Sequence, residues 1–348
     1  MVPGLRSSRF FKIFLAIVFF ISISLISFGS DTIDLGQKPE IVSGSVSLSQ
    51  PGQICQEVTL GFYFLEGGKL DFLNSQIPLD FYVWAIVPGS DTPSFEFLNS
   101  KNCTINKQND EPWPGKENFR YLGYRVYGLF EQDLDLKNFP FDAYDIGVIV
   151  EDTTKDATER KYVPDLKNSN LDKLFKISGW RVDGFEITSK VQKYSTNFGF
   201  PAESDSKNSY SRIEVKMHLV RDNLIIFVKV VTPVILFLLI SLLGVFLPID
   251  QISQRINLCV GALFSSVAYH VNIASGLPPV SYLTFVDKMM MGNYLLIFMN
   301  IFFCIAIFMA NKNDYPNLER FLAKSIRIIL PTIFVVTYAI FIKHFLFP

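Results

Sequence analysis

Apolar and polar positions divide the chain into two parts with different periodicity. From about residue 40 to residue 221, short runs of alternating apolar and polar residues are separated by Gly, Asn, Asp and Pro. A period of two is typical of half-buried strands, and no long amphipathic helix lies between the runs. From residue 224 onward, the chain consists mainly of apolar segments long enough to cross a bilayer as helices. We therefore predict a β-rich domain followed by a membrane domain.

Four segments make up the predicted membrane domain. One of them, residues 256–273, carries Asn, Ser and His, which a helix facing lipid on every side does not tolerate. The other three are almost uninterrupted apolar sequence: residues 224–247, 289–310 and 328–346. The predicted fold is an immunoglobulin-like antiparallel β-sandwich of about ten strands over residues 40–221, followed by a four-helix transmembrane bundle over residues 224–348.

The polar segment forms a narrow stripe when it is drawn as a helix. At 100° per residue, seven positions fall within an arc of about 80°: Ser253, Asn257, Gly261, Phe264, Ala268, Val271 and Ser275. Two interpretations stay open, a surface that faces water or a seam of small residues against another membrane helix. His270 falls at about 260° on this wheel, where a hydrogen bond to a neighbouring helix fits better than a role as a pH sensor.

The first thirty residues have the pattern of a secretory signal peptide, over residues 1–30. Three basic residues precede an apolar core at 13–26, and small residues follow it. An uncleaved anchor is the alternative, and either form exports the next stretch. We therefore expect a multi-pass protein of the plasma (inner) membrane whose N-terminal domain faces the periplasm or the exterior. The loop at 311–327 is then internal, and its excess of Lys and Arg agrees with the positive-inside rule.

Charge and motif content argue against an enzyme. The net charge of −1 gives no reason to propose nucleic acid as a partner. With three histidines, and without a nucleophile elbow, a phosphate-binding loop or a zinc-protease motif, we expect no catalytic site, no metal and no cofactor. Cys259 and Cys304 lie in predicted spans, whereas Cys55 and Cys103 lie in the exported part, where a disulfide is permitted but not required.

Several short motifs resemble one family, in the order in which they occur there: Phe139-Pro140-Phe141-Asp142, the strand from Tyr210 to Arg221, Pro233 inside the first span, Arg255 before the polar helix, and Leu277-Pro278-Pro279-Val280-Ser281-Tyr282 after it. Together they resemble the pentameric ligand-gated ion channels, the Cys-loop receptors. No cysteines flank the first motif, which is similar to the bacterial members that lack the disulfide of this loop.

The resemblance implies a homopentamer in which five copies of the polar helix surround a pore for inorganic ions. The stripe would line this pore, and Phe264 would form the gate, because five apolar side chains around a narrow lumen can stop ions by expelling water. Ordinary helix packing is the alternative for Phe264. Cation-selective relatives usually carry a carboxylate where this chain has Gln254. Asp250 is the nearest carboxylate of the inner mouth and favours cations, with a helix cap as its alternative role.

The resemblance also implies a small-molecule agonist site between adjacent sandwiches, formed by Tyr82, Glu151, Tyr194 and Tyr210. Aromatic rings beside a carboxylate suit an ammonium group. Thr153 stands where a further aromatic residue is expected, so the agonist stays open between an amine, a proton and a divalent cation. Each tyrosine has packing across a sheet as its alternative role.

Gating would be transmitted where the sandwich meets the membrane. By resemblance, the loop with Pro140 and Asp142 and the turn at 66–69 rest on the linker from Pro278 to Tyr282. Arg221 would pair with an acid such as Asp142, and a buried pair of this kind is costly to break from one side.

Two other classes of membrane protein remain as alternatives. A secondary transporter would be expected to contain internal repeats and helices broken near the middle of the membrane, whereas only Pro233 lies well inside a span. A structural or adhesion protein anchored by a helical bundle would not need the polar stripe.

Overall fold

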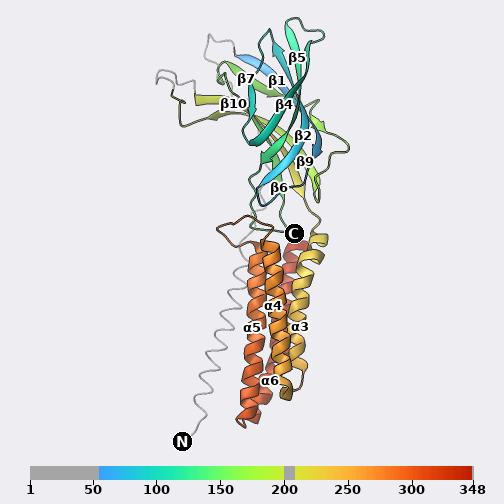
Figure 1. The fold of residues 1–348 in the computed structure, drawn as a ribbon, viewed down its shortest axis with the longest axis vertical. Coiled ribbons are helices and arrows are strands. Elements are labelled where there is room, and N and C mark those ends of the chain that lie inside the picture. The colour runs from blue at the N-terminus through green and yellow to red at the C-terminus, as the bar shows by residue number, and fades with distance from the viewer. Residues whose placement is uncertain (1–54, 200–207, 347–348) are drawn as a thin grey trace.

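The computed structural model describes residues 55–199 and 208–346, and side chains up to residue 339. The predicted signal peptide over residues 1–30 lies outside these residues. The described chain forms a β-sandwich followed by a bundle of four long helices, which confirms the predicted fold class (Figure 1).

Over residues 55–199 and 208–221, the sandwich has ten strands in two sheets. The larger sheet has the order β4-β5-β2-β1-β7, with β8 also paired to β1. Its strands are β1 (Gln56–Gly67), β2 (Gln76–Pro88), β4 (Ser100–Pro112), β5 (Phe119–Glu131), β7 (Arg160–Pro164) and β8 (Asn170–Leu171). The smaller sheet has the order β3-β6-β10-β9, made of β3 (Phe95–Phe97), β6 (Tyr144–Asp152), β9 (Arg181–Lys193) and β10 (Ser209–Val220).

The alternation seen in the sequence places one face of each strand in the core. In β10, every second residue from Ile213 to Leu219 is buried, and the residues between them point outward. The β2 strand alternates in the same way, and Phe81 stacks on Phe64 of β1 with ring centroids 4.7 Å apart. Because side chains of a strand alternate between its faces, the outward residues of β6 and β10 share one surface.

The first membrane span consists of three consecutive helical segments: α2 (Asn223–Ile226), the π-helical η2 (Phe227–Val231) and α3 (Thr232–Phe246). Pro233 has no N–H group to donate to the carbonyl of Lys229, four residues earlier. The Tyr269 hydroxyl of the next span lies 3.1 Å from the Lys229 and Val230 carbonyls and supplies a donor. This contact satisfies backbone groups that an apolar environment would leave unpaired.

The other three spans extend beyond the predicted apolar segments: α4 (Ile252–Ala274), after the short 3-10 helix η3 (Ile249–Gln251), then α5 (Phe285–Lys312) and α6 (Pro316–Leu346). Their added turns mix charged or polar residues with apolar ones, and a search for uninterrupted apolar sequence does not detect such turns. In α5, Thr284 and Asp287 form a capping box at the start of the helix. The α6 helix begins twelve residues before the predicted span at residue 328, because its first turns carry charged residues.

Buried polar contacts join the spans. The Asn293 side-chain amide donates to the Ser266 hydroxyl at 2.6 Å, and the Asn300 amide donates to the Ser241 carbonyl at 2.6 Å. Arg255 is 2% exposed and donates to the Leu247 carbonyl, just after the C-terminal end of α3. These contacts connect α4 and α5 to one another and to α3.

Candidate functional site

The stripe on α4 is the face of the helix that its own chain leaves uncovered. All seven stripe residues are exposed, and Phe264 and Val271 reach 72% and 64% exposure. The opposite face of α4 is buried through Arg255, Cys259, Ala262 and Ser266. Gly261 has open space where a Cβ atom would stand. Within the described bundle, the stripe is therefore not a packing seam between helices of one chain.

The start of α4 carries the two residues predicted for the inner mouth. Asp250 lies in η3 and Gln254 in the first turn of α4, and both are exposed. Among the described residues, no hydrogen bond joins the Asp250 side chain to the start of α4. Capping therefore does not account for this carboxylate.

His270 contacts the neighbouring helix, which confirms the prediction made from the helical wheel. Its Nδ1 atom lies 3.0 Å from the Tyr294 hydroxyl, and its Nε2 atom lies 2.8 Å from a carboxylate oxygen of Asp287. Both partners belong to α5. His270 thus joins the outer half of α4 to α5.

On the outward face of the smaller sheet, the structure brings together Glu151, Tyr194 and Tyr210. The Tyr194 hydroxyl donates to the Glu151 carboxylate at 2.7 Å, and the rings of Tyr194 and Tyr210 meet edge to face with centroids 6.0 Å apart. Phe198 completes an aromatic trio, with centroids 5.4 Å from Tyr194 and 6.0 Å from Tyr210. We call Tyr194, Phe198 and Tyr210 the aromatic trio.

Arg212 changes the electrostatics expected of this site. Its Nε atom donates to one oxygen of Glu151 at 2.5 Å, and Tyr194 already occupies the other oxygen. Glu151 is only 3% exposed, and each of its two oxygens accepts a hydrogen bond from within the chain. Burial and the Glu151 carboxylate raise the pKa of Tyr194, which keeps its hydroxyl a donor.

The sequence pattern did not single out Arg212 or Phe198 as site residues. For Arg212 a signal existed, because it lies two residues after Tyr210 and shares its face of β10. Phe198 lies between β9 and β10, where no periodicity applies.

Tyr82, the fourth residue predicted for this site, belongs to the larger sheet. It lies on β2, is 38% exposed, and has the Arg125 guanidinium 5.9 Å from its ring centroid. Arg125 in turn pairs with Asp80 at 2.7 Å. The described chain shows no contact between Tyr82 and the aromatic trio, so a site containing both needs a second copy of the chain.

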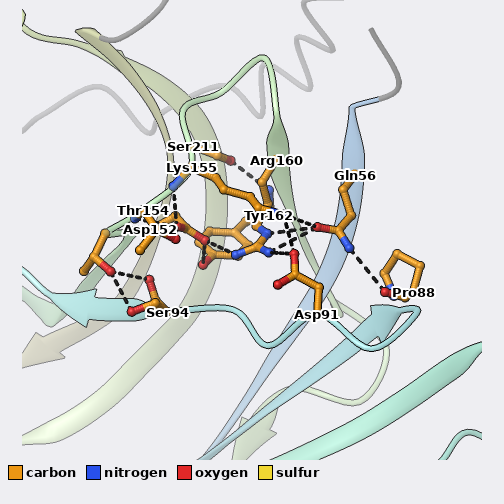
Figure 2. Close-up of polar contacts among 11 residues, drawn as sticks. Gln56, Pro88, Asp91, Ser94, Asp152, Thr154, Lys155, Arg160, Tyr162 and Ser211 are labelled. Atoms are coloured by element: carbon orange, nitrogen blue, oxygen red, sulfur yellow. Dashed lines mark hydrogen bonds and ion pairs between the residues drawn. The ribbon is translucent and has the colours of Figure 1, made fainter. Parts of the chain in front are cut away.

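A buried ion network supports the end of β6 next to Glu151 (Figure 2). Arg160 is 1% exposed and pairs with Asp152 at 2.6 Å and with Asp91. The Tyr162 hydroxyl donates to the same oxygen of Asp152 at 2.7 Å. Burial opposes ionisation of Asp152, but hydrogen bonds from Tyr162 and from backbone N–H groups outweigh it and lower the pKa of this carboxyl.

The loop that contains Pro140 contacts the start of α5 and the linker before it. The backbone N–H of Leu136 donates to the Tyr282 hydroxyl at 3.0 Å, and the N–H of Phe285 donates to the Lys137 carbonyl at 2.8 Å. Pro140 is buried and Pro278 is half-buried. The sandwich and the bundle are therefore joined by one backbone–backbone hydrogen bond and by one from a backbone N–H to the Tyr282 side chain.

Arg221 lies at this junction but differs from the expected ion pair. Its guanidinium stacks over Trp180 at 4.0 Å from the ring centroid, with the Phe72 and Phe139 rings at 5.2 and 5.8 Å. No ion pair within 4.0 Å joins Arg221 to Asp142 in the described chain. An aromatic cage thus takes the place of a carboxylate, because the flat guanidinium fits ring faces.

Asp142 is instead paired with Tyr144, whose hydroxyl donates to one of its oxygens. The other oxygen is buried and has no hydrogen-bond partner among the residues that the structure describes. Burial raises the pKa of Asp142, although the Tyr144 hydroxyl and the more distant Arg221 charge oppose this. A carboxyl with this environment favours its neutral form more than a free one does.

Sequence comparison finds no family model that matches the chain and no curated protein that matches it.

Cys55 and Cys103 are free thiols in the structure. The molecule is a multi-pass membrane protein with four helices able to span a bilayer after a β-rich domain, an architecture compatible with a pentameric channel.

Proposed function

We propose that the chain is one subunit of a homopentameric ligand-gated ion channel in the plasma (inner) membrane, with the sandwich facing the periplasm or the exterior. The observation that carries this proposal is the stripe on α4, which is polar at its start and exposed along its whole length. A single helix with such a face is poorly solvated by lipid. Five stripes facing one another would share a water-filled lumen.

In this assembly the gate lies at Phe264. The side chain is 72% exposed in the single chain and stands near the middle of α4, with Ala268 and Val271 farther out on the same stripe. Five such rings would narrow the lumen to an apolar constriction that excludes water, and with it ions.

Cations are the favoured permeant ions. The exposed Asp250, repeated five times at the inner mouth, would give a ring of negative potential. Gln254 adds no charge to this ring.

The agonist would bind between the aromatic trio of one subunit and Tyr82 of the next. Because Arg212 balances Glu151, an amine would be held by ring faces rather than by this carboxylate. Protons and divalent cations remain the other agonist classes. Movement of the site would reach the pore through β10, which ends at Val220 next to Arg221, and through the loop bound to Tyr282.

The test is current through the purified chain in a planar bilayer under a salt gradient, while amines, pH and calcium are varied. Phe264→Ala should raise the resting current, since the constriction widens. Leu258→Ala is the matched control, because it removes a similar side chain outside the stripe. If neither wild type nor Phe264→Ala conducts, and the mass in detergent is not that of five chains, the proposal fails.

A further inference from the structure

The end of the bundle opposite the sandwich contains a hollow lined by positive charge. It has a volume of about 350 Å³, within the range of small-molecule sites, and lies between η3 and the first turns of α6. Its lining residues are Ile249, Glu319, Arg320, Ala323, Lys324, Arg327 and Ile328. No function assigned above uses this hollow.

The three cations of the hollow share one face of α6. Arg320, Lys324 and Arg327 are spaced by four and three residues, which places them within an arc of about 60° on a helix. All three are exposed, and none forms an ion pair with any residue in the described part of the chain. Their charge is therefore available to a ligand.

The one carboxylate in the lining is already engaged. Glu319 is half-buried and accepts a hydrogen bond from the Asn311 side-chain amide at 3.0 Å. Three cations and one carboxylate leave an excess of two positive charges around the hollow. An anion with several acceptor oxygens suits such a set.

The position of the hollow along the bundle identifies the source of that anion. Arg327 directly precedes Ile328, which is 58% exposed and begins the apolar part of α6. Leu243 and Phe246, near the end of α3, are each 60% exposed. Cations thus stand where the helix passes from polar to apolar surface, the level at which lipid head groups lie.

We propose that this hollow binds the head group of an anionic phospholipid, with the phosphate between Arg320, Lys324 and Arg327 and the acyl chains along the apolar surface beyond Ile328. With the sandwich exported, the lipid belongs to the cytoplasmic leaflet. Ile249 lies in the turn that leads into α4, so the bound lipid touches the segment from which the stripe helix starts. The inference goes beyond channel function. Lipid binding needs only that the bundle spans a membrane, whereas the choice of leaflet rests on the orientation given under the proposed function.

The test is lipid retention by the purified full-length chain in a neutral detergent, followed by native mass spectrometry. The probes are dioleoylphosphatidylglycerol and dioleoylphosphatidylcholine. Wild type should retain the anionic lipid at least about tenfold better. Arg320→Gln, Lys324→Gln and Arg327→Gln should each weaken retention about fivefold, and the triple variant about a hundredfold.

Lys312→Gln is the matched control, because it removes a positive charge at the same end of the bundle without lining the hollow. It should leave retention unchanged within about twofold. Equal retention of both lipids by wild type would overturn the proposal, as would an effect of Lys312→Gln as large as that of Lys324→Gln.

Soluble phosphate is tested in a separate arm with glycerol 1-phosphate. If it displaces the lipid at equal concentration, the site is one for soluble anions and the lipid proposal is wrong. Failure to displace the lipid supports it. Should the triple variant not fold, the three single variants decide. Because the readout is binding, this test is independent of whether the chain conducts ions.

Discussion

The stripe on α4 and the site around Glu151 differ in how far one chain completes them. At the Glu151 site, Arg212 and Tyr194 satisfy both carboxylate oxygens within the same subunit. On α4, the stripe residues are left exposed. Polar groups that are satisfied internally hold a fold together, whereas a polar surface left open in a membrane helix requires water or further copies of the chain.

The largest effect on stability is expected next to Glu151, where the chain satisfies its polar groups internally. Asp152→Asn removes the charge that pairs with the buried Arg160 and should lower the free energy of unfolding by about 3–5 kcal/mol. Because the pKa of Asp152 is lowered in the folded state, its contribution is present above the ordinary value of 3.8 and is lost as pH falls through the folded pKa. Tryptophan fluorescence during denaturation of the sandwich checks this.

The control for that prediction is Asp110→Asn, which breaks the exposed pair with Arg120. This variant should denature like wild type, since exposed pairs contribute little. An equal loss of unfolding free energy in Asp152→Asn and Asp110→Asn would mean that burial does not make the Arg160 network more stabilising than an exposed ion pair.

Glu151→Gln should have the next largest effect and sharpens the comparison directly. It removes the charged acceptor of the Arg212 Nε atom and leaves Arg212 with the longer 3.8 Å contact to Glu214. The loss should cost about 1.5–3 kcal/mol of stability, the value of hydrogen bonds to charged groups. If Glu151 serves the fold rather than the ligand, the agonist concentration for half-maximal current should change less than for Tyr210→Leu, which removes a ring of the trio. A larger shift of this concentration for Glu151→Gln than for Tyr210→Leu would indicate that Glu151 contacts the ligand.

At the junction, Arg221→Lys tests the aromatic cage. Lysine keeps the charge but loses the flat stacking surface on Trp180, so stability should fall by about 0.5–2 kcal/mol. Arg221→Ala should also give a channel that assembles poorly or does not open. Normal currents from Arg221→Ala would remove the proposed coupling.

Asp142 gives a smaller effect with the opposite pH dependence from Asp152. Its pKa is raised in the folded state, so the folded chain binds this proton more tightly and the stability due to it is lost as pH rises through the folded pKa. Asp142→Asn should remove this dependence and leave stability at neutral pH equal or higher. Melting temperatures of wild type and Asp142→Asn, measured from acidic to neutral pH, check the sign of this pH dependence. Parallel plots of melting temperature against pH for the two proteins would contradict the prediction.

The smallest expected stability change is on the stripe. Phe264→Ala should alter the free energy of unfolding of the monomer by less than about 0.5 kcal/mol, because the ring is 72% exposed, while raising the resting current. Chemical denaturation in detergent beside bilayer recording separates the two effects. A large loss of stability without added current would place Phe264 in a packing interface.

Local periodicity in the sequence determined the secondary-structure elements and the faces that they expose. A period of two predicted alternating strands such as β2 and β10, and long apolar segments predicted the four spans. The wheel predicted the stripe on α4 and the contact of His270 with another helix. It left open whether the stripe faces water or a neighbouring helix. These features depend on backbone geometry and on the solubility of each side chain, which neighbours along the chain reveal.

Tertiary structure decided which distant groups meet. Glu151 and Arg212 are 61 positions apart, and they become partners only through the register of β6 against β10. The cage of Arg221 gathers Phe72, Phe139 and Trp180 from three separate loops, and the hollow on α6 needs Ile249 from the turn before α4. Such contacts depend on how the elements pack in space. A local sequence pattern does not identify the partner of a given residue, because many other side chains of the same type occur along the chain.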